Sequence, residues 1–115
     1  MARVVAYIPD LLFGSNVLSA LERADLQVAL AADLSTAAAQ LAGAELLIVD
    51  LTADALERIE AIQRLRPADV PVLAFYSHVE AAVRERAETA GFELVIPRSR
   101  MAREGAVLAE RLLAR

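Results

Sequence analysis

The chain contains no cysteine, no lysine and a single histidine among its 115 residues. Without cysteine, disulfides, thiolate metal sites and cysteine nucleophiles are excluded. Without lysine, Schiff-base chemistry and a phosphate-binding lysine are excluded as well. A zinc site that needs several histidine ligands is also excluded, because His78 stands alone.

Long hydrophobic runs are absent too. Hydrophobic residues make up 57% of the chain, but much of this share is alanine, and no apolar run approaches the roughly 20 residues of a membrane span. The chain opens directly on a strand-like pattern, so we expect no signal peptide and a cytoplasmic location. No dense basic stripe or aromatic platform is present, so we expect no nucleic-acid or membrane partner.

The net charge is −4, and it is distributed unevenly. Residues 1–83 hold five arginines against eleven acids, whereas residues 84–115 hold seven arginines against five acids. Such asymmetry can steer a partner toward one end of a molecule. An ordinary solvated surface explains the same distribution more simply.

Strand-like and helix-like patterns alternate along the whole chain. Strand patterns cover residues 3–8, 26–30, 46–50, 70–76 and 94–96. Helical patterns cover residues 11–24, a short segment capped by Asp33 or Ser35 that ends near Gly43, and residues 53–66, 79–90 and 100–114. Five such units in succession predict one α/β domain over residues 1–115, with helices on both faces of a parallel sheet.

The third strand pattern is the most informative segment. The run ELLIVD, residues 45–50, is almost wholly apolar and ends in one carboxylate. This pattern is typical of a strand buried on both faces of a parallel sheet. In open parallel sheets, ligands bind at the carboxyl ends of the strands. Asp50 is therefore a candidate functional acid.

Three motifs together resemble the receiver domain of bacterial response regulators. They are LLIVDL at residues 46–51, VPVL at residues 70–73 and AETAG at residues 87–91, in the family's order and spacing. The resemblance covers essentially the whole chain. It implies a flavodoxin-like (CheY-like) three-layer α/β/α fold, with a five-stranded parallel sheet in the order 2-1-3-4-5. It also places Asp50 at the phosphoacceptor position.

The other reactive positions of the family are altered here. The acidic pair that holds Mg²⁺ corresponds to Ile8 and Pro9, and Asp10 follows one step late as a weak candidate metal ligand. The invariant lysine corresponds to Arg98. Mg²⁺ requires octahedral oxygen ligation, which Asp50 alone supplies poorly. We therefore expect no cofactor, and we expect Arg98 to pair with Asp50 through its planar guanidinium.

Several of these residues have simpler structural interpretations. Asp10 suits the N-cap of the first helix better than a metal site. The hydroxyl position at the end of the fourth strand corresponds to Tyr76, followed by Ser77. Ser77 and Glu80 match a capping box, whereas a switch role and a packing role for Tyr76 stay open. His78 is interpreted as a loop residue at a helix start.

The sequence therefore predicts a stand-alone receiver-like signalling domain with a degenerate phosphorylation site. No nucleophile and base lie together in the pattern, so we do not expect an enzyme. In receivers the fourth helix, fifth strand and fifth helix form the interaction face, which here carries Arg84, Arg98, Arg100 and Arg103. Its partners would be other signalling proteins, of unknown identity, or a second copy in a weak homodimer.

Two alternatives stay open. The first is a functional response regulator that accepts a phosphoryl group on Asp50 with the help of Mg²⁺. The second is a flavodoxin-like domain that binds a small ligand in the crevice at the strand ends. The segment IPDLLFG, residues 8–14, is too apolar for a convincing phosphate loop.

Overall fold

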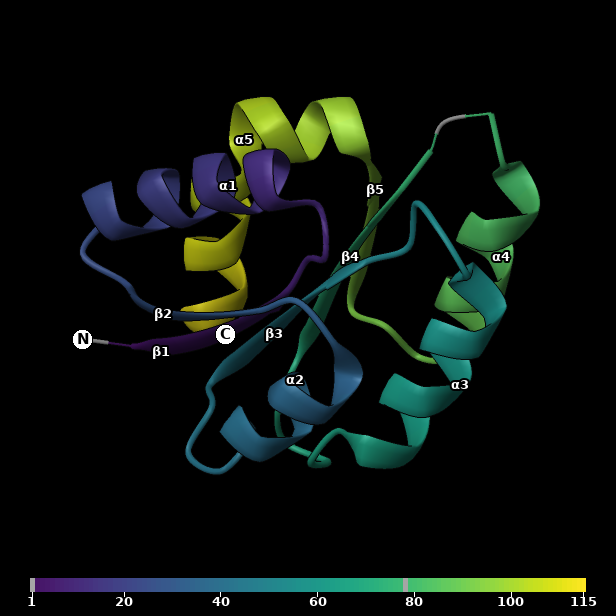
Figure 1. Ribbon diagram of the computed structural model, residues 1–115, viewed down its shortest axis with the longest axis horizontal. Coiled ribbons are helices and arrows are strands. Elements are labelled where there is room, and N and C mark those ends of the chain that lie inside the picture. Colours follow the sequence, from purple (N-terminus) through teal and green to yellow (C-terminus); the bar gives the residue numbers. More distant parts are fainter. Residues whose placement is uncertain (1, 78) are drawn as a thin grey trace.

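The computed structural model describes residues 2–77 and 79–115, which form five strands and five helices in alternation (Figure 1). The strands are β1 (Arg3–Tyr7), β2 (Gln27–Ala31), β3 (Leu46–Asp50), β4 (Val72–Tyr76) and β5 (Leu94–Pro97). The helices are α1 (Leu11–Arg23), α2 (Leu34–Gln40), α3 (Ala55–Leu65), α4 (Ala81–Thr89) and α5 (Arg98–Leu113).

All five strands are parallel and lie in the order β2-β1-β3-β4-β5. This order confirms the predicted flavodoxin-like sheet. The register sets Asp50 of β3 opposite Phe75 of β4, and Tyr76 of β4 opposite Pro97 of β5. The carboxyl ends of the strands therefore meet at one edge, which holds Asp50.

Two hydrophobic cores lie on the two faces of the sheet. Helices α1 and α5 cover one face, and α2, α3 and α4 cover the other (Figure 1). Along β3, Leu46 and Ile48 point into the first core, whereas Leu47 and Val49 point into the second. Every residue of β3 and β4 is buried. This double burial explains the continuous apolar run that identified β3 in the sequence.

The helix caps agree only partly with the sequence patterns. Asp10 caps α1 as predicted, and Asp33, one of the two predicted caps of α2, is the one observed; each accepts a hydrogen bond from a backbone N–H three residues later. Gly91, with φ +86°, follows α4 and ends it as predicted. Helix α3 begins two residues later than predicted, because Asp54 before it has left-handed backbone (φ 48°).

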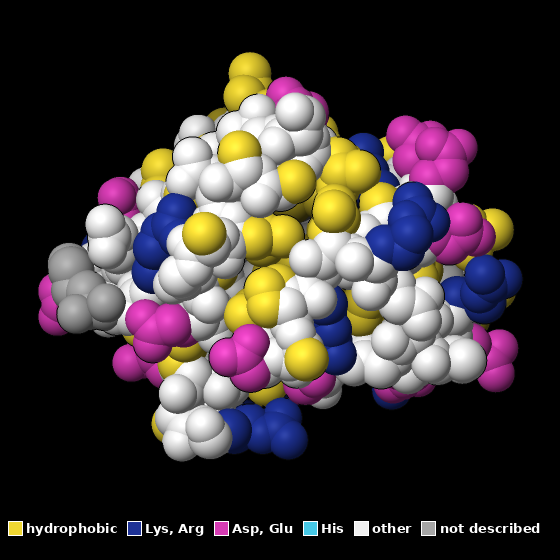
Figure 2. Space-filling model, turned by 90° about the horizontal axis from the view of Figure 1, so that it is seen from below, with side chains coloured by type: hydrophobic (Ala, Val, Ile, Leu, Met, Phe, Trp, Pro, Cys, Tyr) yellow, Lys and Arg dark blue, Asp and Glu magenta, His cyan; other side chains and the backbone are white. Residues whose placement is uncertain are grey.

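The surface mixes charges of both signs. In the view from below, hydrophobic side chains gather near the middle of the face that carries α2 and α3, and acidic and basic side chains stand around them (Figure 2). Among the described residues, no helix is long and apolar enough to cross a membrane.

Candidate functional site at the carboxyl edge of the sheet

Asp50 is the one charged side chain that is buried among the described residues, with 3% of its surface exposed. It is the last residue of β3, and Thr52, two residues later, donates hydrogen bonds to its carboxylate. The backbone N–H of Thr52 donates to Oδ1 of Asp50 at 2.8 Å, and the Thr52 hydroxyl donates to the same oxygen at 2.5 Å. Thr52 therefore supplies two of the hydrogen bonds that a buried carboxylate needs.

Arg58 of α3 supplies the positive charge beside Asp50. Its Nη1 donates to the backbone carbonyl of Asp50 at 2.8 Å and lies 4.0 Å from Oδ1. Its Nη2 lies 3.9 Å from Oδ2 of Asp54, and the guanidinium stands 5.4 Å from the centre of the Tyr7 ring. Only 13% of the Arg58 side chain is exposed. Arg58 therefore covers Asp50 on the side of α3.

The sequence analysis did not identify Arg58, although its helical position carries a signal. It lies three residues after Ala55 and four before Ile62, on the stripe that faces the sheet. A charged residue on such a stripe needs a partner, because burial of an unpaired charge is costly. Two carboxylates lie within reach of Arg58 at that end of the sheet, the buried Asp50 and the exposed Asp54.

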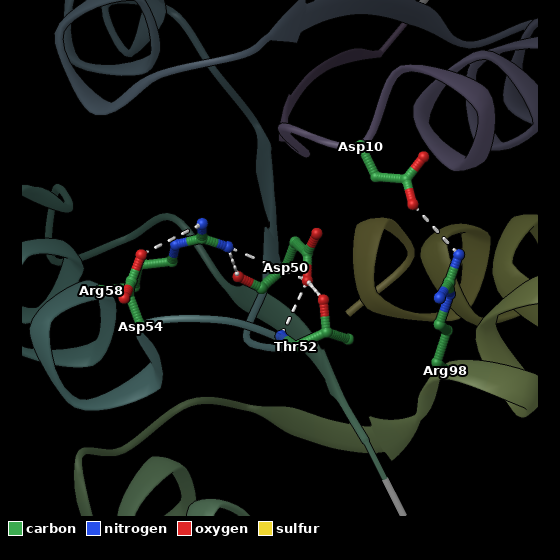
Figure 3. Close-up of polar contacts among 6 residues, drawn as sticks. All are labelled: Asp10, Asp50, Thr52, Asp54, Arg58 and Arg98. Carbon is green, nitrogen blue, oxygen red and sulfur yellow. Dashed lines mark hydrogen bonds and ion pairs between the residues drawn. The ribbon is translucent and has the colours of Figure 1, made fainter.

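The predicted pair between Arg98 and Asp50 is wrong. Arg98 Nη2 lies 3.3 Å from Oδ2 of Asp10 (Figure 3). Its guanidinium lies 4.3 Å from the centre of the Phe13 ring. Arg98 follows β5 directly and is the first residue of helix α5, but its side chain lies along α1, where it meets Asp10 and Phe13 instead of Asp50. Asp50 is approached from the opposite side by Arg58 (Figure 3).

Tyr76 and Ser77 mark the end of β4. Tyr76 is buried in the core under α2, α3 and α4, with 6% of its surface exposed. The predicted capping box of Ser77 and Glu80 is wrong, because α4 begins at Ala81 with Glu80 as its N-cap and without a side-chain cap. The backbone N–H of Glu80 instead donates to the Ser77 carbonyl at 2.9 Å, in a turn that precedes the helix. His78 lies outside the described residues.

The residues at this edge do not fit a magnesium ion. Ile8, in the first position of the expected acidic pair, is 1% exposed and apolar, and Pro9 follows it. Asp10 is occupied by its cap to Phe13 and its pair with Arg98. Among the described residues, no group of three acids or histidines could hold a metal. Mg²⁺ requires several oxygen ligands. One buried aspartate with two arginines nearby does not supply them.

The arginines of the expected interaction face have partners within the chain. Arg84 lies 3.4 Å from Glu88, and Arg100 lies 3.3 Å from Glu104. Arg103 lies 3.9 Å from the same Glu104. Glu88 raises the pKa of Arg84, with a smaller contribution from Tyr76. The face is therefore a set of exposed ion pairs and not a free positive patch.

A hollow of about 570 Å³ opens beside α5 at the same edge of the sheet. Its lining combines three hydroxyl side chains, one guanidinium and two apolar side chains: Thr52, Ser77, Ser99, Arg98, Phe13 and Ala102. A small ligand would bind here if the ligand-binding alternative holds, and that alternative stays a prediction.

Comparison with known proteins supports the fold. No family model and no curated protein matches this sequence. Among solved structures, a response regulator from Thermotoga maritima matches all of this chain over 99% of its own length, at a TM-score of 0.86 and 18% identity. The non-phosphorylated HemR receiver domain from Leptospira biflexa matches all of the chain over 96% of its own length, at 0.82 and 22% identity.

A third structure gives the same result. A response regulator receiver domain protein from Clostridium thermocellum aligns with 99% of this chain over 95% of its own length, at a TM-score of 0.85 and 12% identity. At these identities the likeness establishes the architecture alone. The chain has the CheY-like fold of response-regulator receiver domains.

Proposed function

We propose that this chain is a receiver-like signalling domain that acts through protein–protein contacts, and that Asp50 does not accept a phosphoryl group. The observation that carries the proposal is the enclosure of Asp50. Its Oδ1 accepts two hydrogen bonds from Thr52, and the guanidinium of Arg58 lies against it. The carboxylate therefore already has hydrogen-bond donors and a cation beside it within the protein.

Phosphoryl transfer to a carboxylate brings two anions into contact, and a metal ion normally neutralises the developing charge. Arg58 supplies positive charge to Asp50 but no open coordination position for a phosphoryl donor. The positions of the missing ligands carry Ile8 and Pro9, which offer no side-chain oxygen. The contacts of Thr52 and Arg58 with the Asp50 carboxylate therefore oppose its use as a nucleophile.

The signalling role is supported by the fold. The three structural neighbours are response regulators or their receiver domains. In this proposal the domain signals through contacts with other proteins, without phosphorylation of Asp50. The alternative, a phospho-accepting response regulator, differs from the proposal in one measurable property.

That property is tested by incubation with acetyl phosphate and Mg²⁺, followed by intact-mass analysis. We expect no phosphoryl adduct on the unmodified protein. The Asp50→Asn variant is the matched control, and a receiver domain with an intact acidic pair verifies the donor. An adduct that forms on the protein and is lost in Asp50→Asn would overturn the proposal in favour of the phospho-accepting alternative.

A further inference from the structure

Strands β2 and β5 form the two edges of the sheet, and four of the five residues of β2 are exposed or partly exposed. The Gln27 N–H donates to the Ala2 carbonyl at 2.9 Å, and the Ala31 carbonyl accepts from Ile8 at 3.0 Å, so both residues face β1. Backbone groups alternate in direction along a strand. The N–H and C=O groups of Val28 and Leu30 must therefore point away from the sheet.

β2 lacks the features that commonly protect an edge strand. Natural edges carry charges, prolines or bulges that prevent pairing with another chain. The strand reads QVALA, with neither a charge nor a proline, and pairs with β1 without a bulge over its five residues. Val28, Ala29 and Leu30 are each partly exposed. An extended segment can therefore approach this side of the sheet.

The opposite edge is built differently. β5 has four residues and ends in Pro97, which has no N–H to donate. Charged residues bracket it directly, with Glu93 paired to Arg66 on one side and Arg98 paired to Asp10 on the other. The two edges thus differ in protection, and β2 is the one open to a further strand.

Acidic residues bracket β2 at a distance. Asp25 precedes the strand in a left-handed turn (φ 62°), and Asp33 follows it as the N-cap of α2; both are exposed. The backbone N–H of Thr36 and its hydroxyl lower the pKa of Asp33, which keeps that carboxylate ionised. Arg23, at the end of α1, is the nearest opposing charge along the chain.

We propose that the outer edge of β2 is a docking site for an extended peptide segment of a partner protein, with apolar residues in its middle and basic residues at both ends. The segment would add a sixth strand through the backbone groups of Val28 and Leu30. The basic residues would meet Asp25 and Asp33.

A second copy of this chain fits the same edge less well. A two-fold antiparallel pairing of Val28 with Leu30 would set Asp25 of one copy against Asp33 of the other at both ends. Like charges in opposing positions are destabilising. A five-residue strand also provides little of the roughly 1,200 Å² that a stable interface buries.

This inference deepens the proposed function by naming a surface and a partner class, and the site lies apart from Asp50. A failure of peptide binding would leave the acetyl phosphate result untouched. Conversely, an adduct on Asp50 would not by itself decide whether a peptide binds at β2. The two proposals can therefore fail separately.

The test is a titration of the ¹⁵N-labelled protein with the synthetic peptide Lys-Thr-Val-Thr-Val-Thr-Lys, followed through the amides of Val28 and Leu30. The Val28→Pro variant removes an outward donor that takes no part in the ladder with β1, and Val28→Thr is its matched control. A double variant, Asp25→Asn with Asp33→Asn, removes both charges, because asparagine tolerates left-handed backbone and caps helices well.

We expect saturable shifts of both amides and binding about fivefold weaker in Val28→Pro than in Val28→Thr. The double Asn variant, and a peptide with Glu in place of Lys, should bind more weakly. A peptide methylated at every internal backbone nitrogen should not bind, and this probe serves if Val28→Pro fails to fold.

Three results would overturn the proposal. The first is the absence of shifts at Val28 and Leu30. The second is equal binding by Val28→Pro and Val28→Thr or by the methylated peptide. The third is a shift of the same amides with protein concentration alone, which would assign the edge to a second copy.

Discussion

Two arginine–carboxylate pairs lie at the carboxyl edge of this sheet, and they differ mainly in burial. In the inner pair, the side chains of Arg58 and Asp50 are 13% and 4% exposed. In the outer pair, those of Arg98 and Asp10 are 47% and 46% exposed. An exposed pair contributes little to stability, whereas a buried charge that loses its partner is strongly destabilising.

A third pair, at the amino ends of β4 and β5, is intermediate in burial. Arg66 Nη1 lies 2.6 Å from Oε1 of Glu93, with exposed fractions of 18% and 29%. Glu93 also accepts a hydrogen bond from the backbone N–H of Val72, at the start of β4. The three pairs therefore form a series in burial, and this series predicts how much each contributes to the free energy of unfolding.

The inner pair should show the largest effect. Arg58→Ala leaves the buried Asp50 without its cation and removes packing against Tyr7, so we expect a loss of about 2–3 kcal/mol in the free energy of unfolding. Arg64→Ala, an exposed arginine of the same helix, is the matched control and should change it by less than about 0.5 kcal/mol. Urea denaturation measures both free energies of unfolding. Equal losses in the two variants would contradict the claim that Arg58 stabilises the fold through Asp50.

The intermediate pair should show a smaller effect with a distinct pH dependence. Burial acts to raise the pKa of Glu93, but hydrogen bonds from Arg66 and Val72 outweigh it and lower the pKa. Glu93→Gln should therefore cost about 1–2 kcal/mol at neutral pH. The ionised native form contributes fully above the unfolded pKa of about 4.3, and this contribution is lost as pH falls through the lower folded pKa.

Thermal unfolding across an acid series tests this prediction. The unmodified protein should lose stability below about pH 4.3 more steeply than Glu93→Gln does. Glu88→Gln, in an exposed pair, is a suitable control and should leave the slope almost unchanged. Parallel curves for the unmodified protein and Glu93→Gln would contradict the assignment.

The outer pair should show the smallest effect of the three. Asp10→Asn keeps the N-cap of α1 and removes the charge that faces Arg98, so it should cost less than about 0.5 kcal/mol. Asp10→Ala loses the cap as well and should cost about 1 kcal/mol. If Asp10→Asn is as damaging as Asp10→Ala, the ion pair outweighs the cap and the series in burial fails.

The arginines of the expected interaction face should contribute only weakly to self-association. Because Arg84 and Arg100 pair within their own helices, any dimer through this face should be weak and salt-sensitive. Arg84→Glu and Arg100→Glu should each weaken association by about twofold. Sedimentation across a salt series measures this, and association that is unaffected by salt and by both reversals would leave this interface without support.

The fold was predictable because it depends on patterns that the sequence displays directly. β3 was predicted with its observed bounds, since a strand buried on both faces requires a continuous apolar run. The cap of Asp10 was predictable for a similar reason, because capping is a local interaction. The starts of α3 and α4 were not, because they depend on the backbone of Asp54 and on a turn before Ala81.

The choice of ion-pair partners was not predictable from the sequence. Arg98 and Arg58 both lie close to the same edge of the sheet, and the sequence order of strands and helices does not say which carboxylate each one meets. The side chain of Arg98 lies along α1 and over Phe13, whereas Arg58 faces the sheet from α3. Partner choice therefore depends on tertiary packing, which the periodic patterns do not record.

The central claim is that Asp50 is held by hydrogen bonds from Thr52 and by the guanidinium of Arg58, and not by a metal ion. A titration of the ¹⁵N-labelled protein with Mg²⁺, observed at the amide of Thr52, tests it most directly, since this N–H donates to Oδ1 of Asp50. We predict no saturable shift of the Thr52 amide at millimolar Mg²⁺. A saturable shift that disappears in Asp50→Asn would contradict the claim, because it would show that Asp50 binds the metal despite Arg58.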